Sequence, residues 1–77
     1  MIPAIIDDKV LTRLKEVMGW SSRRFDNLDH FYDELRKWYN EFYHGDASMG
    51  YSAEKLGLNT LDLRNLLDDL GWPIYDM

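Results

Sequence analysis

The sequence predicts an all-α fold, a small four-helix domain that ends in a helix-turn-helix pair. Apolar residues recur at intervals of three and four along the chain, as in amphipathic helices, and no segment alternates as a strand does. Capping residues or glycines stand at the ends of these periodic segments. With 77 residues and no internal repeat, the chain is expected to form a single helical domain over residues 1–77.

The first helix is expected over residues 8–19. Asp7 or Asp8 supplies its N-cap, and Gly19 is expected to end it. The apolar side chains of this segment fall within an arc of about 120°, which predicts one buried face. That face consists of Val10, Leu11, Leu14, Val17 and Met18.

The second and longest helix is expected over residues 27–44, with Gly45 following as a stop signal. Its apolar stripe is about 140° wide and predicts a scaffold on which the other helices pack. An open apolar patch of Tyr32, Tyr39 and Tyr43 in the monomer would favour a protein interface. The full stripe consists of Leu28, Phe31, Tyr32, Leu35, Trp38, Tyr39, Phe42 and Tyr43.

Residues 49–71 are predicted to form the helix-turn-helix pair. Gly57 is the turn glycine, Ala53 lets the two helices cross closely, and Asn59 caps the second helix through its side-chain oxygen. A tight helix pair needs these residue types whether or not it meets DNA. The positions expected to be buried are Leu56, Leu58, Leu63, Leu66, Leu67 and Leu70.

The second helix of this pair is a candidate reader of DNA. In such proteins it lies in the major groove, and its outward side chains meet bases and phosphates. Between residues 51 and 70, however, two basic residues face four acidic ones, and phosphate neutralisation supplies most non-specific affinity. Leu61 on the same face contacts either a thymine methyl or a protein. The candidate DNA-binding residues are Asn59, Thr60, Arg64 and Asn65.

A basic segment over residues 9–24 favours nucleic acid. It carries five cations and one carboxylate, although the chain has a net charge of −5. If it lies beside the helix pair, it can hold phosphates; otherwise it is a solvated helix face and loop. Trp20 and Phe25 are expected to pin the polar joint at residues 21–24 to the core. The candidate phosphate contacts are Arg13, Lys15, Arg23 and Arg24, with Lys9 in the same segment.

The composition argues against an enzyme. There is no cysteine, so thiol catalysis, disulfides and thiolate metal sites are excluded. His30 and His44 are fourteen residues apart on one helix, about 21 Å, and are not expected to share a metal. No serine has an evident histidine base, and no glycine loop suits a phosphate. We therefore expect no catalytic residue, no metal and no cofactor.

The N-terminal segment is not expected to be a signal peptide. Residues 1–10 contain a short apolar run without a basic flank, unlike a signal peptide. No apolar segment approaches the roughly 20 residues that a membrane span requires. The sequence thus predicts a cytoplasmic protein that does not bind a membrane. After Gly71, Pro73 prevents further helix, and the tail WPIYD is expected to fold back on the core.

The run FYHGDASMGYSAEKLGLNTLDLRNLLDDLGWPIYD resembles the C-terminal part of a family of small, mostly uncharacterised prokaryotic proteins regarded as antitoxin-like. In that family an aromatic-rich helix ends in glycine, a serine-glycine loop leads to an alanine-rich helix, and a leucine-rich helix closes before a proline. The resemblance covers under half the chain, and Ser52 replaces the usual alanine. The matching residues are Tyr43, Gly45, Ser48, Gly50, Ala53, Leu56, Gly57, Leu66, Leu67, Gly71 and Pro73.

This resemblance implies an antitoxin role, in which the protein neutralises a toxin by direct binding and represses its own operon. Two functions therefore remain open. The first is a dimeric transcription-regulator-like module that binds DNA through the helix-turn-helix. The second is a protein-protein interaction module that uses Leu61, or aromatic residues of the long helix, against a toxin, another protein or a second copy.

Overall fold

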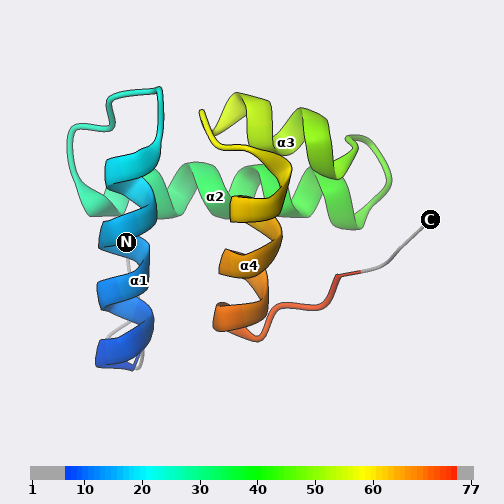
Figure 1. Ribbon diagram of the computed structural model, residues 1–77. Helices are drawn as coiled ribbons and strands as arrows, with labels where there is room; N and C mark the ends of the chain where they lie inside the picture. The colour runs from blue at the N-terminus through cyan, green and yellow to red at the C-terminus, as the bar shows by residue number, and fades with distance from the viewer. Residues whose placement is uncertain (1–6, 75–77) are drawn as a thin grey trace.

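The computed structural model describes residues 7–74 and has no strand among them. The predicted all-α class is therefore confirmed (Figure 1). The N-terminal apolar run, and Tyr75 and Asp76 of the tail, lie outside the described residues. The helices are α1 (Asp8–Trp20), α2 (Leu28–Tyr43), α3 (Met49–Lys55) and α4 (Thr60–Leu70).

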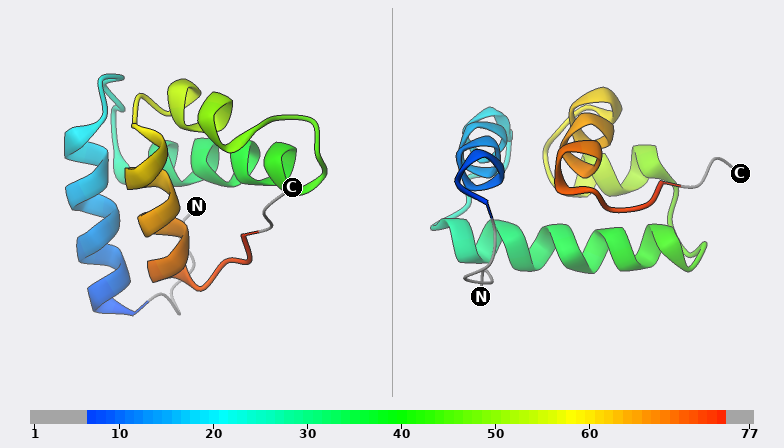
Figure 2. Two further views of the ribbon diagram at one scale, coloured as in Figure 1. Left: turned by 45° about the vertical axis from the view of Figure 1, so that its right-hand side comes forward. Right: turned by 90° about the horizontal axis from the view of Figure 1, so that it is seen from below.

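The helices form two layers. In one layer α1 and α4 lie side by side and run in opposite directions (Figure 1). Both lie on the same side of α2, the longest helix, which forms the other layer (Figure 2). The short α3 returns along α2 and contacts both α2 and α4. Most of the apolar stripe of α2 is thus covered by the other helices, whereas Tyr43 at its end is exposed.

A single core receives side chains from all four helices. The positions predicted to be buried in the helix pair are buried, except Leu70, which is partly buried and packs at the edge. Each large apolar side chain that leaves water stabilises the fold by about 1.5 to 3 kcal/mol. The buried apolar residues are Leu14, Val17, Phe31, Tyr32, Leu35, Ala53, Leu56, Leu58, Leu63, Leu66 and Leu67.

Each helix begins at a polar side chain that caps it. Asp7 accepts a hydrogen bond of 2.9 Å from the amide two residues on. Asn59 accepts one of 2.7 Å from the amide three residues on. Both caps were predicted, and Asn27 and Ser48 cap α2 and α3 in the same way. Such a cap contributes about 1 kcal/mol.

Glycine was predicted to end three of the helices, and it ends two of them. Gly45 and Gly71 have positive φ values of 82° and 74° and stop α2 and α4, as expected. The prediction that Gly19 ends α1 is wrong, because α1 continues to Trp20. The helix ends where Ser21 becomes extended, with ψ of 136°. Ser21 and Ser22, which follow α1, instead form hydrogen bonds with Leu56 and Gly57.

The turn between α3 and α4 is joined to the loop between α1 and α2. The Ser22 amide donates to the Gly57 carbonyl at 2.8 Å, and the Ser21 hydroxyl donates to the Leu56 carbonyl at 2.6 Å. Gly57 has a φ of 71°. A Cβ there would lie 2.5 Å from Ser21 Oγ and 2.6 Å from the Arg23 amide nitrogen. Both the backbone conformation and the close approach require glycine.

Gly57→Ala is expected to lower the free energy of unfolding by about 2 to 4 kcal/mol, because strain and overlap act together. Gly71→Ala has the same kind of strain at φ 74°, but nothing lies within 4 Å of its Cβ position. It is expected to cost about 1 kcal/mol. Urea unfolding followed by circular dichroism measures both losses.

Gly19→Ala is the control for adding a methyl group at an open site inside a helix, where nothing lies within 4 Å. It is expected to stabilise the protein by about 0.5 to 1 kcal/mol. Equal losses for the alanine variants of Gly57 and Gly71 would contradict a role for the close contact between the loop and the turn.

Candidate functional site

The outer face of α4 is a solvent-exposed strip, defined by Leu61, Arg64, Asn65 and Asp68. All four are exposed, and Leu61 is the most exposed large apolar residue among residues 7–74, at 65%. Thr60 is also exposed at the start of the helix. The opposite stripe of leucines is buried, so the fold determines which side of α4 faces solvent. These predicted candidates therefore share one accessible face.

Asn59 has a structural role at the start of this helix. Its side-chain oxygen accepts the Asp62 amide, so that oxygen is engaged in capping. Arg64 and Asp68 lie four residues apart, and on the outer face they contribute one positive and one negative charge. The outer face of α4 is therefore close to neutral and carries no cluster of cations.

Arg13 lies at the contact between α1 and α4. Its Nε donates to Asp69 Oδ2 at 2.9 Å, and its Nη1 is 3.5 Å from Glu16 Oε2. The guanidinium carbon also lies 5.0 Å from the centre of the Trp20 ring. The structure thus brings Arg13 next to α4, as the phosphate-contact hypothesis required. Two carboxylates within the protein already balance its charge.

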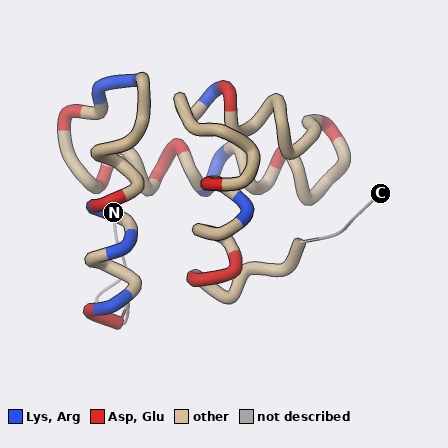
Figure 3. Tube along the Cα trace, viewed as in Figure 1, with Lys and Arg blue, Asp and Glu red and all other residues tan. Residues whose placement is uncertain are grey.

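The basic segment does not gather into one surface (Figure 3). Lys9 and Lys15 are exposed on α1, whereas Arg23 and Arg24 are exposed on the loop after it. Arg23 Nη1 donates to the Lys55 carbonyl at 2.5 Å, which places the loop beside the end of α3. Arg23, Arg24 and Lys55 therefore lie at the end of the molecule where α4 begins. Sequence reasoning did not single out Lys55, because its neighbour Arg23 is distant along the chain.

The expectation that Trp20 pins the joint to the core is wrong. Trp20 is 52% exposed, whereas Phe25 is partly buried and packs edge-on against Phe31 and His30. Trp20 is seven residues after Arg13, two helical turns on, and so lies on the same side of α1. The Trp20 ring lies beside the guanidinium of Arg13, which is bonded to Asp69 near the end of α4.

The three tyrosines of α2 do not form an open patch. Tyr32 is 5% exposed, Tyr39 is partly buried and Tyr43 is 46% exposed. The ring of Trp72 covers the first two, at 5.9 Å and 4.9 Å between ring centres. The Tyr39 hydroxyl donates to the Pro73 carbonyl at 2.8 Å, so the described part of the tail folds back as predicted. The proposed interface on α2 loses its support.

Neither a metal centre nor a membrane span is found in the part of the chain that the structure describes. No group of three or more potential metal ligands converges within residues 7–74. His30 instead packs on Phe25 and lies 3.8 Å from Glu34. Over the same residues, every helix is too short or too polar to cross a bilayer.

Comparison with known proteins adds no relative. The chain matches no family model, no curated protein and no solved structure. The likeness of its C-terminal half to antitoxin-like proteins therefore stays a prediction that rests on the residues given above. The function must be argued from the surface itself.

Stability is expected to fall at alkaline pH through Tyr39. Burial raises the pKa of its hydroxyl, and the neighbouring Tyr43 raises it further. The folded protein then holds this proton more tightly than the unfolded chain does. The contribution of Tyr39 to the free energy of unfolding is therefore fully present below a pH of about 10. It is lost as the pH rises through the higher pKa of the folded state. This decline is measured by urea unfolding curves recorded between pH 8 and 11, at intervals of about half a pH unit.

In Tyr39→Phe the decline should be shallower, and the hydrogen bond to Pro73 is lost, at about 1 kcal/mol near neutral pH. Tyr51→Phe, on α3 and away from the tail, controls for removal of a phenol. An alkaline decline that is identical in Tyr39→Phe and the unmodified protein would contradict the assignment.

Proposed function

We propose that this protein is a non-catalytic binding module with an antitoxin-like role, and that it contacts a partner protein through α4. The observation that carries the proposal is Leu61, which is 65% exposed on the outer face of a helix whose other side is fully packed. The contact surface is the outer face of α4 together with Trp20.

Trp20 and Leu61 belong to one end of the molecule. Trp20 is the last residue of α1 and Leu61 is the second of α4, and these two ends meet at the hydrogen bond from Ser22 to Gly57. The two helices pack side by side from that point, with antiparallel chain directions. Trp20 and Leu61 are both exposed, and tryptophan in particular is enriched at protein interfaces and among the residues that contribute most to binding.

The charge of this surface favours protein over nucleic acid. The outer face of α4 balances one cation with one carboxylate, and Arg13 beside it is paired with Asp69. The chain as a whole has a net charge of −5, which repels a phosphate backbone. Interface centres, in contrast, are depleted in charge and enriched in aromatic side chains. The resemblance to antitoxin-like proteins adds that the partner is a toxin.

Leu61→Asp is expected to weaken binding to the protein encoded beside this one in its operon by roughly tenfold or more, the loss typical of a central apolar anchor. Co-purification of the two proteins, followed by calorimetric titration, measures the loss. Thr12→Asp is the matched control, because Thr12 is exposed on α1 and the substitution adds the same charge.

Trp20→Ala should weaken the same complex and lower the free energy of unfolding by about 1 to 2 kcal/mol, since the side chain is half buried and packs against Arg13. A complex that tolerates both Leu61→Asp and Trp20→Ala would contradict this surface. No complex with the neighbouring gene product would contradict the antitoxin-like role.

DNA binding is the second candidate, and one observation favours it. Arg23, Arg24 and Lys55 lie together where α4 begins, and the N-terminal end of a helix also attracts phosphate. In this arrangement Thr60 and Asn65 face the major groove of the DNA, while the cations of the loop contact its phosphate backbone. Such binding requires that the attraction between the loop cations and the phosphates exceed the repulsion from the carboxylates of Asp62 and Asp68.

An amide NMR titration with a random-sequence duplex at low salt tests the DNA candidate. Binding should shift residues 59–65 together with the loop at 21–24, and added salt should reverse the shifts. Arg24→Gln should flatten the salt dependence by about one counterion. A spectrum that does not change at low salt would exclude this candidate and leave the protein partner.

A further inference from the structure

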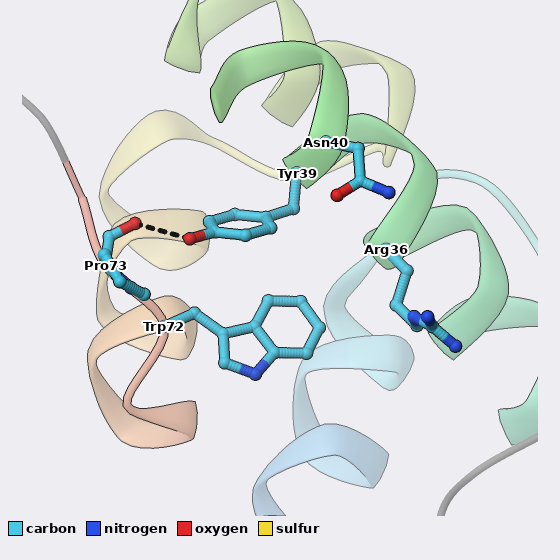
Figure 4. A pocket seen from close by; sticks show the side chains of 5 residues that line it. All are labelled: Arg36, Tyr39, Asn40, Trp72 and Pro73. Atoms are coloured by element: carbon cyan, nitrogen blue, oxygen red, sulfur yellow. Dashed lines mark hydrogen bonds between the residues drawn. The ribbon is translucent and has the colours of Figure 1, made fainter. Parts of the chain in front are cut away.

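A concave site lies between α2 and the residues that follow α4. It is a depression of about 220 Å³ lined by five residues (Figure 4). Nothing in the proposed binding role of α4 uses it. Its residues are Arg36, Tyr39, Asn40, Trp72 and Pro73.

One side of this depression is aromatic and is held in place. The Tyr39 and Trp72 rings are 4.9 Å apart between centres with an interplanar angle of 47°, and Tyr32 packs edge-on behind Trp72. The Tyr39 hydroxyl donates to the Pro73 carbonyl, which ties the tail to α2 (Figure 4). A ring placed against this wall meets preorganised aromatic faces, so little ordering of side chains opposes its binding.

The other side of the depression is polar and cationic. Arg36 and Asn40 are four residues apart on α2, so their side chains lie on one face of that helix. Both line the depression, and Figure 4 shows them on α2 beside the rings of Tyr39 and Trp72. No carboxylate lines it, and it carries one positive charge in a chain of net charge −5.

We propose that this depression binds a small planar aromatic carboxylate. The guanidinium of Arg36 presents a planar fork that matches a carboxylate with two hydrogen bonds, and the Asn40 amide adds a further donor. A single guanidinium balances a monoanion, whereas a phosphate group carries about −1.5 to −2 charges. The volume corresponds to about seven water molecules, which suits one aromatic ring with its carboxylate.

The test is an NMR titration of the ¹⁵N-labelled protein with sodium benzoate. We expect saturable shifts of the Trp72 indole N–H and of the Arg36 side chain, with a dissociation constant in the millimolar range, as befits so small a ligand. Benzamide has the ring without the charge, and sodium acetate has the charge without the ring. Each should bind at least roughly fivefold more weakly than benzoate, because each lacks one of the two contacts.

Arg36→Gln should weaken benzoate binding at least roughly fivefold, since it removes the charged partner. Lys37→Gln is the matched control, because it removes the same charge from the next residue of α2, which does not line the depression. Trp20, exposed on α1, reports any general adsorption of the ring. Absence of saturable shifts, equal binding of benzamide, or equal binding by Arg36→Gln would overturn the proposal.

Discussion

The contact between the α1–α2 loop and the α3–α4 turn is the constraint on which the arrangement of helices depends. The Ser22 amide and the Ser21 hydroxyl donate to consecutive carbonyls, those of Gly57 and Leu56. Because α1 ends and α4 begins at this contact, both helices extend from it to the same side, where they pack against each other with antiparallel chain directions. The Arg13 ion pair with Asp69 then joins them farther along. Two short connections thereby hold four helices around one core.

This contact also gives Gly57 a structural role that is independent of any DNA binding. In a helix-turn-helix protein a turn glycine is commonly associated with DNA recognition, yet here Gly57 is required by its backbone conformation and by the loop packed on it. Its presence is explained by the fold alone. The functional argument consequently rests on the exposed side chains of α4 and on the charges around them, which the packing does not require.

Local signals in the sequence predicted most of the fold. The caps at Asp7 and Asn59 and the left-handed glycines depend on a few neighbouring residues, so they could be predicted without tertiary information. The exposure of Trp20 and the end of α1 depend on contacts between distant segments. So does the pairing of Arg13 with Asp69, 56 residues away, which uses a cation that the sequence suggested for phosphate. The helical periodicity of the leucines was enough to predict which side of α4 is exposed. It could not predict which residues of α1 lie beside that helix.

The exposed apolar residues differ in what they imply. A single exposed aromatic such as Tyr43 or Tyr51 is ordinary on a protein surface and needs no partner. Tyr51 in addition packs on Trp38 and under the ammonium of Lys55. Trp20 likewise packs against the guanidinium of Arg13, whereas Leu61 is the most exposed large apolar side chain among residues 7–74 and is not part of the core. Because Leu61 is 65% exposed and lies outside the core, packing within the domain does not require an apolar residue at this position.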